Sequence, residues 1–176
     1  MSAAGIARYV VRALGFAGVV CACWAAARLI LLRRRGAGID VRRELRLLLR
    51  TGYLAALAEI IALRGGSGSV RALRLVPLQT TLEELRAGAW PFAYHAAGNM
   101  IWFVPLGMLL GRKRPLWQAA AVGAGVSLAL ELAQWILRTG VTDVDDVLLN
   151  ALGALLGAAA VRLYHSLRGR RLEGKR

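Results

Sequence analysis

Five long apolar runs, separated by short segments rich in arginine, dominate this sequence of 176 residues. The runs cover residues 13–32, 46–63, 93–110, 116–137 and 146–164. Each approaches the roughly 20 residues that an α-helix needs to cross the hydrocarbon core of a bilayer. The sequence therefore predicts an all-α fold, an integral membrane bundle of about five transmembrane helices. Arg50 and Glu59 interrupt the second run, and an ion near the bilayer centre costs at least ~2.5 kcal/mol, so a four-span bundle with an interfacial second helix is the alternative.

The composition excludes several classes of function. The chain has 24 Lys and Arg against 10 Asp and Glu, a net charge of +14, and 57% hydrophobic residues. The basic residues cluster between apolar runs, as they do beside anionic membrane lipid, which favours lipid as the partner and disfavours nucleic acid. Cys21 and Cys23 lie inside an apolar run with one residue between them, which supports neither a disulfide framework nor a zinc site. No metal and no cofactor is expected.

The positions of the basic residues predict the orientation in a bacterial cell membrane. Arginine is abundant in the first loop, in the loop at 112–114 and in the tail, so these segments are expected on the cytoplasmic side. This places the C-terminus in the cytoplasm and the N-terminus outside; only the N-terminus changes side if the second run does not cross. The first run is interpreted as a retained span, because Arg33, Arg34 and Arg35 follow it as a stop-transfer signal. The expected organisation is N-terminal membrane segments at 1–73, a membrane core at 74–164 and a basic cytoplasmic tail at 165–176.

Polar residues in the last three runs recur at helical spacing and at one predicted depth, near the outer ends of the helices. Residues at i, i+4 and i+7 share one face of a helix. The three polar faces are His95, Asn99 and Trp102 in the third run, Ser127, Glu131 and Gln134 in the fourth, and Asp146, Asn150, Gly153 and Gly157 in the fifth. Their common level predicts one shared polar site.

Each part of this polar site also has a structural interpretation. Glu131 lies in an otherwise apolar run, where an ionisable residue is a functional candidate that needs a partner such as Arg138, Arg74 or a proton shared with Asp146. Asp143, Asp145 and Asp146 could instead cap a helix together with Thr142. The amides and Ser127 could simply hydrogen-bond between helices. His95 is more typical of a satisfied interfacial histidine than of a ligand, and stays outside the predicted site. Gly153 and Gly157 are expected to serve helix packing, and Pro105 kinks its helix for packing or to open a cavity.

The C-terminal half resembles the VanZ-like family of small multispan membrane proteins. Four ordered motifs carry the resemblance over about residues 74–164: Arg74-Leu-Val-Pro-Leu, Gly98-Asn-Met-Ile-Trp-Phe-Val-Pro-Leu-Gly107, Ser127-Leu-Ala-Leu-Glu-Leu-Ala-Gln134, and Asp143-Val-Asp-Asp-Val-Leu-Leu-Asn-Ala-Leu-Gly-Ala-Leu-Leu-Gly157. The resemblance implies a four- or five-span bacterial membrane protein, with members linked to resistance toward teicoplanin-type glycopeptides. The family usually has an arginine a few residues before the acidic pair, where this chain has Gly140, and Arg138 stands two residues earlier.

Three hypotheses about function follow. The leading one is a non-enzymatic cell-envelope membrane protein whose outer polar pocket binds a lipid-linked or cell-wall-related molecule, or changes glycopeptide access to it. The second is an intramembrane enzyme acting on a lipid-linked substrate, with Glu131 as general base and the three aspartates holding a metal or orienting a leaving group. The third is a helical accessory subunit in which the polar residues only join helices. The sparse His and Cys content disfavours the enzyme.

Overall fold

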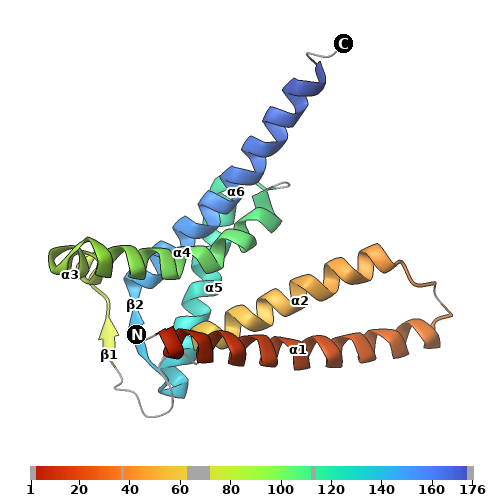
Figure 1. Cartoon of the computed structure of the whole chain (residues 1–176), viewed down its shortest axis with the longest axis horizontal. Coiled ribbons are helices and arrows are strands. Elements are labelled where there is room, and N and C mark those ends of the chain that lie inside the picture. Colours follow the sequence, from red (N-terminus) through yellow and green to blue (C-terminus); the bar gives the residue numbers. More distant parts are fainter. Residues whose placement is uncertain (1–2, 37, 63–71, 112–113, 174–176) are drawn as a thin grey trace. The chain divides into compact units, whose positions relative to one another are not determined.

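The computed structural model describes residues 3–36, 38–62, 72–111 and 114–173, so Arg112 and Lys113 of the basic loop and residues 174–176 of the tail lie outside the described residues. Six helices and two short strands make up the described part of the chain (Figure 1). They are α1 (Ala3–Arg34), α2 (Val41–Ala62), β1 (Ala72–Arg74), α3 (Gln79–Ala87), α4 (Ala89–Gly111), α5 (Leu116–Leu137), β2 (Val141–Asp143) and α6 (Val144–Glu173). The chain divides into two compact units, Met1–Gly68 and Ser69–Arg176.

The first unit is an antiparallel hairpin of α1 and α2. Two ion pairs join the helices at different levels: Arg12 with Glu59, and Arg28 with Glu44. The guanidinium of Arg28 contacts both carboxylate oxygens of Glu44, at 3.0 and 3.2 Å. The Glu59 side chain is almost fully buried against Arg12, so the charge that interrupts the second apolar run has an opposite charge beside it.

The second unit is built around α6, which packs against both α4 and α5 (Figure 1). Glycine and alanine line the contact between α4 and α6. A Cβ at Gly153 or Gly157 would overlap the main-chain carbonyl of Met100 or Val104, and one at Gly107 would overlap that of Ala154. These small residues let the two backbones approach closely. Pro105 lies on the exposed side of α4, away from this contact.

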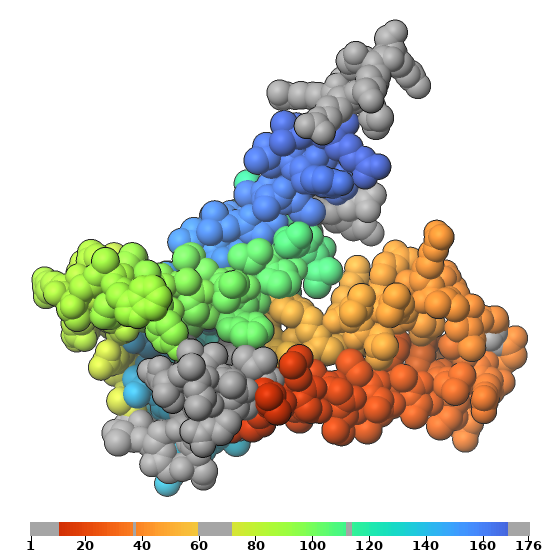
Figure 2. All heavy atoms as spheres, viewed as in Figure 1, coloured from red at the N-terminus to blue at the C-terminus, as the bar shows by residue number. Residues whose placement is uncertain are grey.

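A small polar substructure covers one end of this bundle. β1 and β2 form a parallel pair in which Arg74 is opposite Asp143. Leu78 follows with φ of 64°, in the left-handed region, and α3 begins directly after it. α3, coloured yellow-green in Figure 2, lies at the margin of the second unit. Only Gly88 separates α3 from α4. Neither strand and no helix at 79–87 is predicted from the sequence, but the prediction of an all-α fold is confirmed, because helices make up most of the described residues.

Three of the helices within the described residues are long and apolar enough to cross a membrane by length and composition. They are Val11–Arg34 of α1, Leu116–Leu137 of α5 and Val144–Arg168 of α6. α2 carries several charged residues, and α4 carries His95, Asn99 and two prolines, which lower the mean hydropathy of both helices. The described residues of the five predicted apolar runs all lie in helices, but a bundle of five spans is not confirmed. α6 continues as a helix to Glu173, beyond the predicted start of the tail at residue 165.

Candidate functional site

Polar side chains from both strands and four helices converge where α5 ends and α4 and α6 begin. We call this cluster the polar cap and define it as Arg74, Thr80, Glu84, His95, Asn99, Glu131, Asp143, Asp145 and Asp146. It lies at the opposite end of the unit from Gly111, where the guanidinium of Arg162 donates to the Gly111 carbonyl at 3.1 Å. The second unit therefore has one acidic end and one basic end.

Asp145, in the first turn of α6, forms hydrogen bonds with the start of α3. Its carboxylate accepts the main-chain N–H of Leu78 at 2.5 Å and that of Thr81 at 2.8 Å. The first N–H groups of a helix have no partner within the helix, and a carboxylate is favoured there by the helix dipole. Asp145 is fully buried, so these two bonds replace its hydration. It acts as an N-cap supplied from a distant part of the chain.

Asp143 connects the strand pair to α3 and α6. Its Oδ2 accepts the Thr80 hydroxyl at 2.5 Å, and its Oδ1 accepts the main-chain N–H of Asp145 at 2.9 Å. Arg74, its partner across the strands, donates to the Thr80 hydroxyl oxygen at 3.1 Å and lies 3.6 Å from Glu83. The Arg74 side chain is nearly half exposed, so it presents a positive charge at the rim of the cap.

His95 bridges two carboxylates from two other helices. Its Nε2 lies 2.7 Å from Asp146 Oδ1, and its Nδ1 lies 2.5 Å from Glu84 Oε2. The Asn99 amide donates to the same Asp146 oxygen at 2.7 Å. An imidazole donates from both nitrogens only in its charged form. His95 thus joins α3, α4 and α6 at one point, and Glu84, which is about one-third exposed, forms the open side of this bridge.

The predicted residues of α5 lie deeper. Glu131 is 1% exposed, and its carboxylate accepts the main-chain N–H of Asp143 at 3.2 Å. Ser127 accepts a hydrogen bond from the Asn150 amide at 2.8 Å, and among the described residues Asn150 Oδ1 has no hydrogen-bond partner. Gln134 is buried beside Gly140.

The two candidate anion partners have different positions. Arg74 belongs to the polar cap, whereas Arg138 is exposed and ends α5 in the left-handed conformation, with φ of 55°. Within the described residues, no group of three His, Cys, Asp or Glu side chains has the arrangement of a metal site.

Three functional candidates lie outside the polar site that the sequence predicts. Thr80 and Glu84 lie on α3, a helix that was not predicted, although Thr81-Leu-Glu-Glu84 has the Thr-x-x-Glu spacing of a capping box. His95 shares the i, i+4 face of Asn99, but this spacing alone does not separate a site residue from a satisfied interfacial histidine. The structure places it at the centre of the polar cap.

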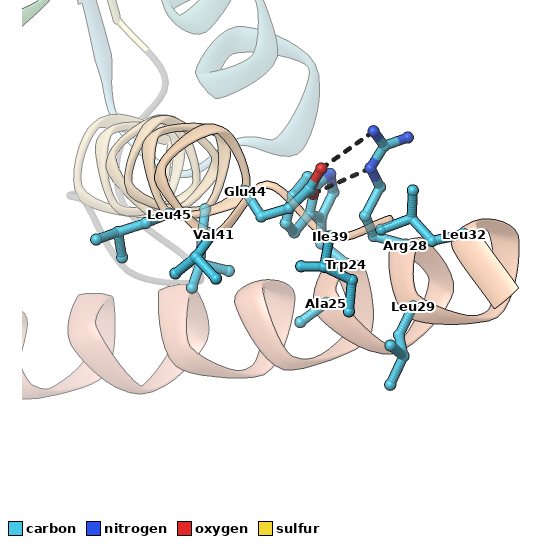
Figure 3. A pocket seen from close by; sticks show the side chains of 10 residues that line it. Trp24, Ala25, Arg28, Leu29, Leu32, Ile39, Val41, Glu44 and Leu45 are labelled. Carbon is cyan, nitrogen blue, oxygen red and sulfur yellow. Dashed lines mark hydrogen bonds and ion pairs between the residues drawn. The ribbon is translucent and has the colours of Figure 1, made fainter. Parts of the chain in front are cut away.

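A separate groove of about 370 Å³ lies between the two helices of the first unit (Figure 3). Apolar side chains such as Trp24, Leu32 and Leu48 line most of it, and the Arg28–Glu44 ion pair lies along one side. It presents few polar groups for specific recognition. A site of this character suits an acyl chain or a neighbouring apolar helix, and it is not part of the polar cap.

A protein-family model described as VanZ/LLP1 matches residues 51–165, which include every residue of the polar cap. The chain belongs to the VanZ/LLP1 family. The family match begins inside α2 and so extends upstream of the four motifs at 74–164. No curated protein and no solved structure matches the chain. Membership of the VanZ/LLP1 family and the three apolar helices together identify a membrane protein with a VanZ-type function at the level of the family.

Proposed function

We propose that this VanZ/LLP1 protein acts at the outer face of the bacterial cell membrane and lowers susceptibility to teicoplanin-type glycopeptides. In this proposal the polar cap binds the polar head of a lipid-linked or cell-wall-related molecule. One observation carries the proposal: His95 lies between carboxylates of two other helices at the acidic end of the second unit. Buried polar networks of this kind are costly to build unless all their members are satisfied.

The open side of the cap supplies groups of both signs. Glu84 and Glu83 are partly exposed, and the Arg74 guanidinium lies 3.6 Å from the Glu83 carboxylate. A planar guanidinium forms paired hydrogen bonds with a phosphate or carboxylate, and the exposed carboxylates accept hydroxyl or amide donors. A polar head that carries an anion together with sugar or peptide donors fits this combination. The buried aspartates keep these groups in place.

The alternative function is a helical accessory subunit, because the same contacts also join elements of the fold. Asp143 and Asp145 each have two hydrogen bonds inside the protein, which is what a structural role needs. The enzyme hypothesis with Glu131 as general base gains no support from the geometry, because that carboxylate is enclosed and accepts a main-chain N–H.

The test is the teicoplanin susceptibility of a sensitive bacterium that expresses the wild type, His95→Gln, Asp146→Asn and Asp40→Asn at matched membrane levels. Asp40 caps α2 at an exposed position, with its Oδ1 3.1 Å from the Arg43 N–H, and serves as the control outside the polar cap. We expect the wild type and Asp40→Asn to raise the inhibitory concentration, and the two cap variants to lose the increase while their size-exclusion profiles in detergent show that they remain folded. Protection that persists in both cap variants would refute binding at the cap. An accessory subunit would lose protection only together with stability.

A further inference from the structure

The short helix α3 has its polar and apolar faces reversed relative to an ordinary surface helix. In a soluble protein such a helix turns its apolar side inward and its polar side toward water. Here the side that packs on the bundle carries Thr80 and Glu84, which bind Asp143 and His95. The opposite side carries Leu78, Leu82 and Leu85, at i, i+4 and i+7 from the start of the helix. We call these three residues the leucine stripe.

The leucine stripe is open to the surroundings. Leu78, Leu82 and Leu85 are 53%, 46% and 51% exposed. Leu75 and Val76, in the turn before α3, are exposed as well. α3 lies at the margin of its unit with one side uncovered (Figure 2). A contiguous apolar surface of this kind marks a contact with another apolar phase.

The helix cannot turn this stripe into the protein. The Asp145 carboxylate accepts hydrogen bonds from the main-chain N–H groups of Leu78 and Thr81. The Asp143 carboxylate accepts one from the Thr80 hydroxyl, and Glu84 is bonded to His95. Rotation about the helix axis would leave these buried carboxylates without partners, which costs several times more than exposing one leucine. The polar cap therefore fixes the direction in which the stripe points.

The residues around the leucine stripe indicate that it contacts a lipid bilayer. α4 begins one residue after α3, and its Trp90, Tyr94 and Ile101 share one exposed face, with Trp90 79% exposed. Trp and Tyr at the end of a membrane helix favour the headgroup layer. Arg86 is exposed on the flank of the stripe, where its side chain can reach anionic headgroups while the leucines enter the acyl region.

We propose that α3 is an interfacial anchor: it lies in the plane of the membrane with the leucine stripe inserted into the acyl boundary. The polar face of α3 then holds the polar cap at the level of the lipid headgroups. This inference goes beyond the proposed function, because it requires only that the protein is in a membrane and does not depend on any ligand of the cap.

The experiment uses nitroxide spin labels on single cysteines of the full chain, in a Cys21→Ala, Cys23→Ala background. Leu82→Cys and Leu85→Cys report on the stripe, and Gln79→Cys and Arg86→Cys are matched controls on the flank of the same helix. The labelled proteins are reconstituted in vesicles of phosphatidylethanolamine and phosphatidylglycerol. Collision with oxygen, which concentrates in lipid, is compared with collision with a water-soluble nickel chelate.

We expect the labels at 82 and 85 to collide mainly with oxygen, at a depth of about 5–10 Å below the phosphates, and those at 79 and 86 to collide mainly with nickel. Nickel access at all four positions would overturn the proposal, because the stripe would then face water. Shielding of 82 and 85 from both reagents would also overturn it, in favour of a covering protein such as a second copy of this chain. Because these side chains are exposed, the labels need not disturb packing, and size-exclusion profiles of the labelled proteins check this.

Discussion

Asp145 shows how a single buried carboxylate can specify the position of a helix. It accepts two main-chain N–H groups at the start of α3. We predict that Asp145→Ala lowers the free energy of unfolding by about 2 kcal/mol, because both donors lose their buried partner. Asp145→Asn keeps one acceptor oxygen and is expected to lose about half as much. Chemical denaturation in detergent micelles, followed by circular dichroism at 222 nm, measures both.

The control for Asp145 is Asp40→Ala, because Asp40 caps α2 at an exposed position. Water can replace the lost bond there, so we expect a loss of at most about 1 kcal/mol. Equal losses at the two positions would contradict the assignment of Asp145 as a buried cap that connects α6 with α3.

Arg138 occupies a backbone conformation that suits glycine. It ends α5 with φ of 55° and ψ of 41°, and the Thr139 N–H bonds the Gln134 carbonyl at 3.1 Å. We predict that Arg138→Gly raises the free energy of unfolding by about 1 kcal/mol, since glycine adopts this region without a Cβ penalty. Arg138→Ala removes the same charge but keeps the Cβ, so it is expected to give no gain. Thermal unfolding of the two variants separates these effects, and a gain in both would show that charge is the cause.

The residues of the polar site were predictable from the sequence only where helical spacing reveals them. Asn99 and Asp146 were predicted and do meet, at 2.7 Å. Thr80 and Glu84 carry no such signal, because they lie outside the five apolar runs, and their partners are 63 and 11 residues away on other elements. Contacts between distant segments depend on tertiary packing, which local spacing does not contain.

At the scale of elements, the close contact between α4 and α6 depends on glycines, which have no Cβ. We predict that Gly157→Ala lowers the free energy of unfolding by about 1–3 kcal/mol, because its Cβ meets the Val104 carbonyl and the helices must separate. Gly125 on α5 is the control, since a Cβ there meets nothing within 4 Å. Gly125→Ala is expected to be neutral or to gain up to about 1 kcal/mol from helix propensity. Equal effects of the two substitutions in thermal unfolding would contradict close packing at Gly157.

The long helices follow from the sequence, and the short elements do not. The described residues of the five apolar runs lie in α1, α2, α4, α5 and α6, because apolar segments of this length are stable as helices in lipid. β1 and β2 have three residues each, too few for a period-two pattern. α3 has nine residues and gains its stability from Asp145, 67 residues away from Leu78, rather than from its own propensity.

At the scale of the whole molecule, the two ends of the second unit carry opposite charges. The polar cap holds five carboxylates at one end, while Arg162 donates to the carbonyl of Gly111, the last residue of α4, at the other end, where a cation is favoured by the helix dipole. Arg114 and the arginines of α6 lie toward that basic end, so we predict from the positive-inside rule that the polar cap faces outward. The orientation of the first unit follows separately, from whether α2 crosses the membrane.

We predict that α2 crosses, as the second half of a hairpin with α1. Glu59 and Glu44 would oppose insertion if isolated, but each is paired with an arginine of α1, which offsets part of the cost of taking the charges into lipid. The loop between the helices is then cytoplasmic. A cysteine at Gly38, where a Cβ meets nothing within 4 Å, should react with a membrane-impermeant maleimide only after cells are permeabilised, in the background without Cys21 and Cys23. Gln79→Cys, expected to react in intact cells, and Arg168→Cys, expected to be protected, calibrate the assay. If Gly38→Cys reacts in intact cells together with Gln79→Cys, α2 lies on the membrane surface and the N-terminus is cytoplasmic.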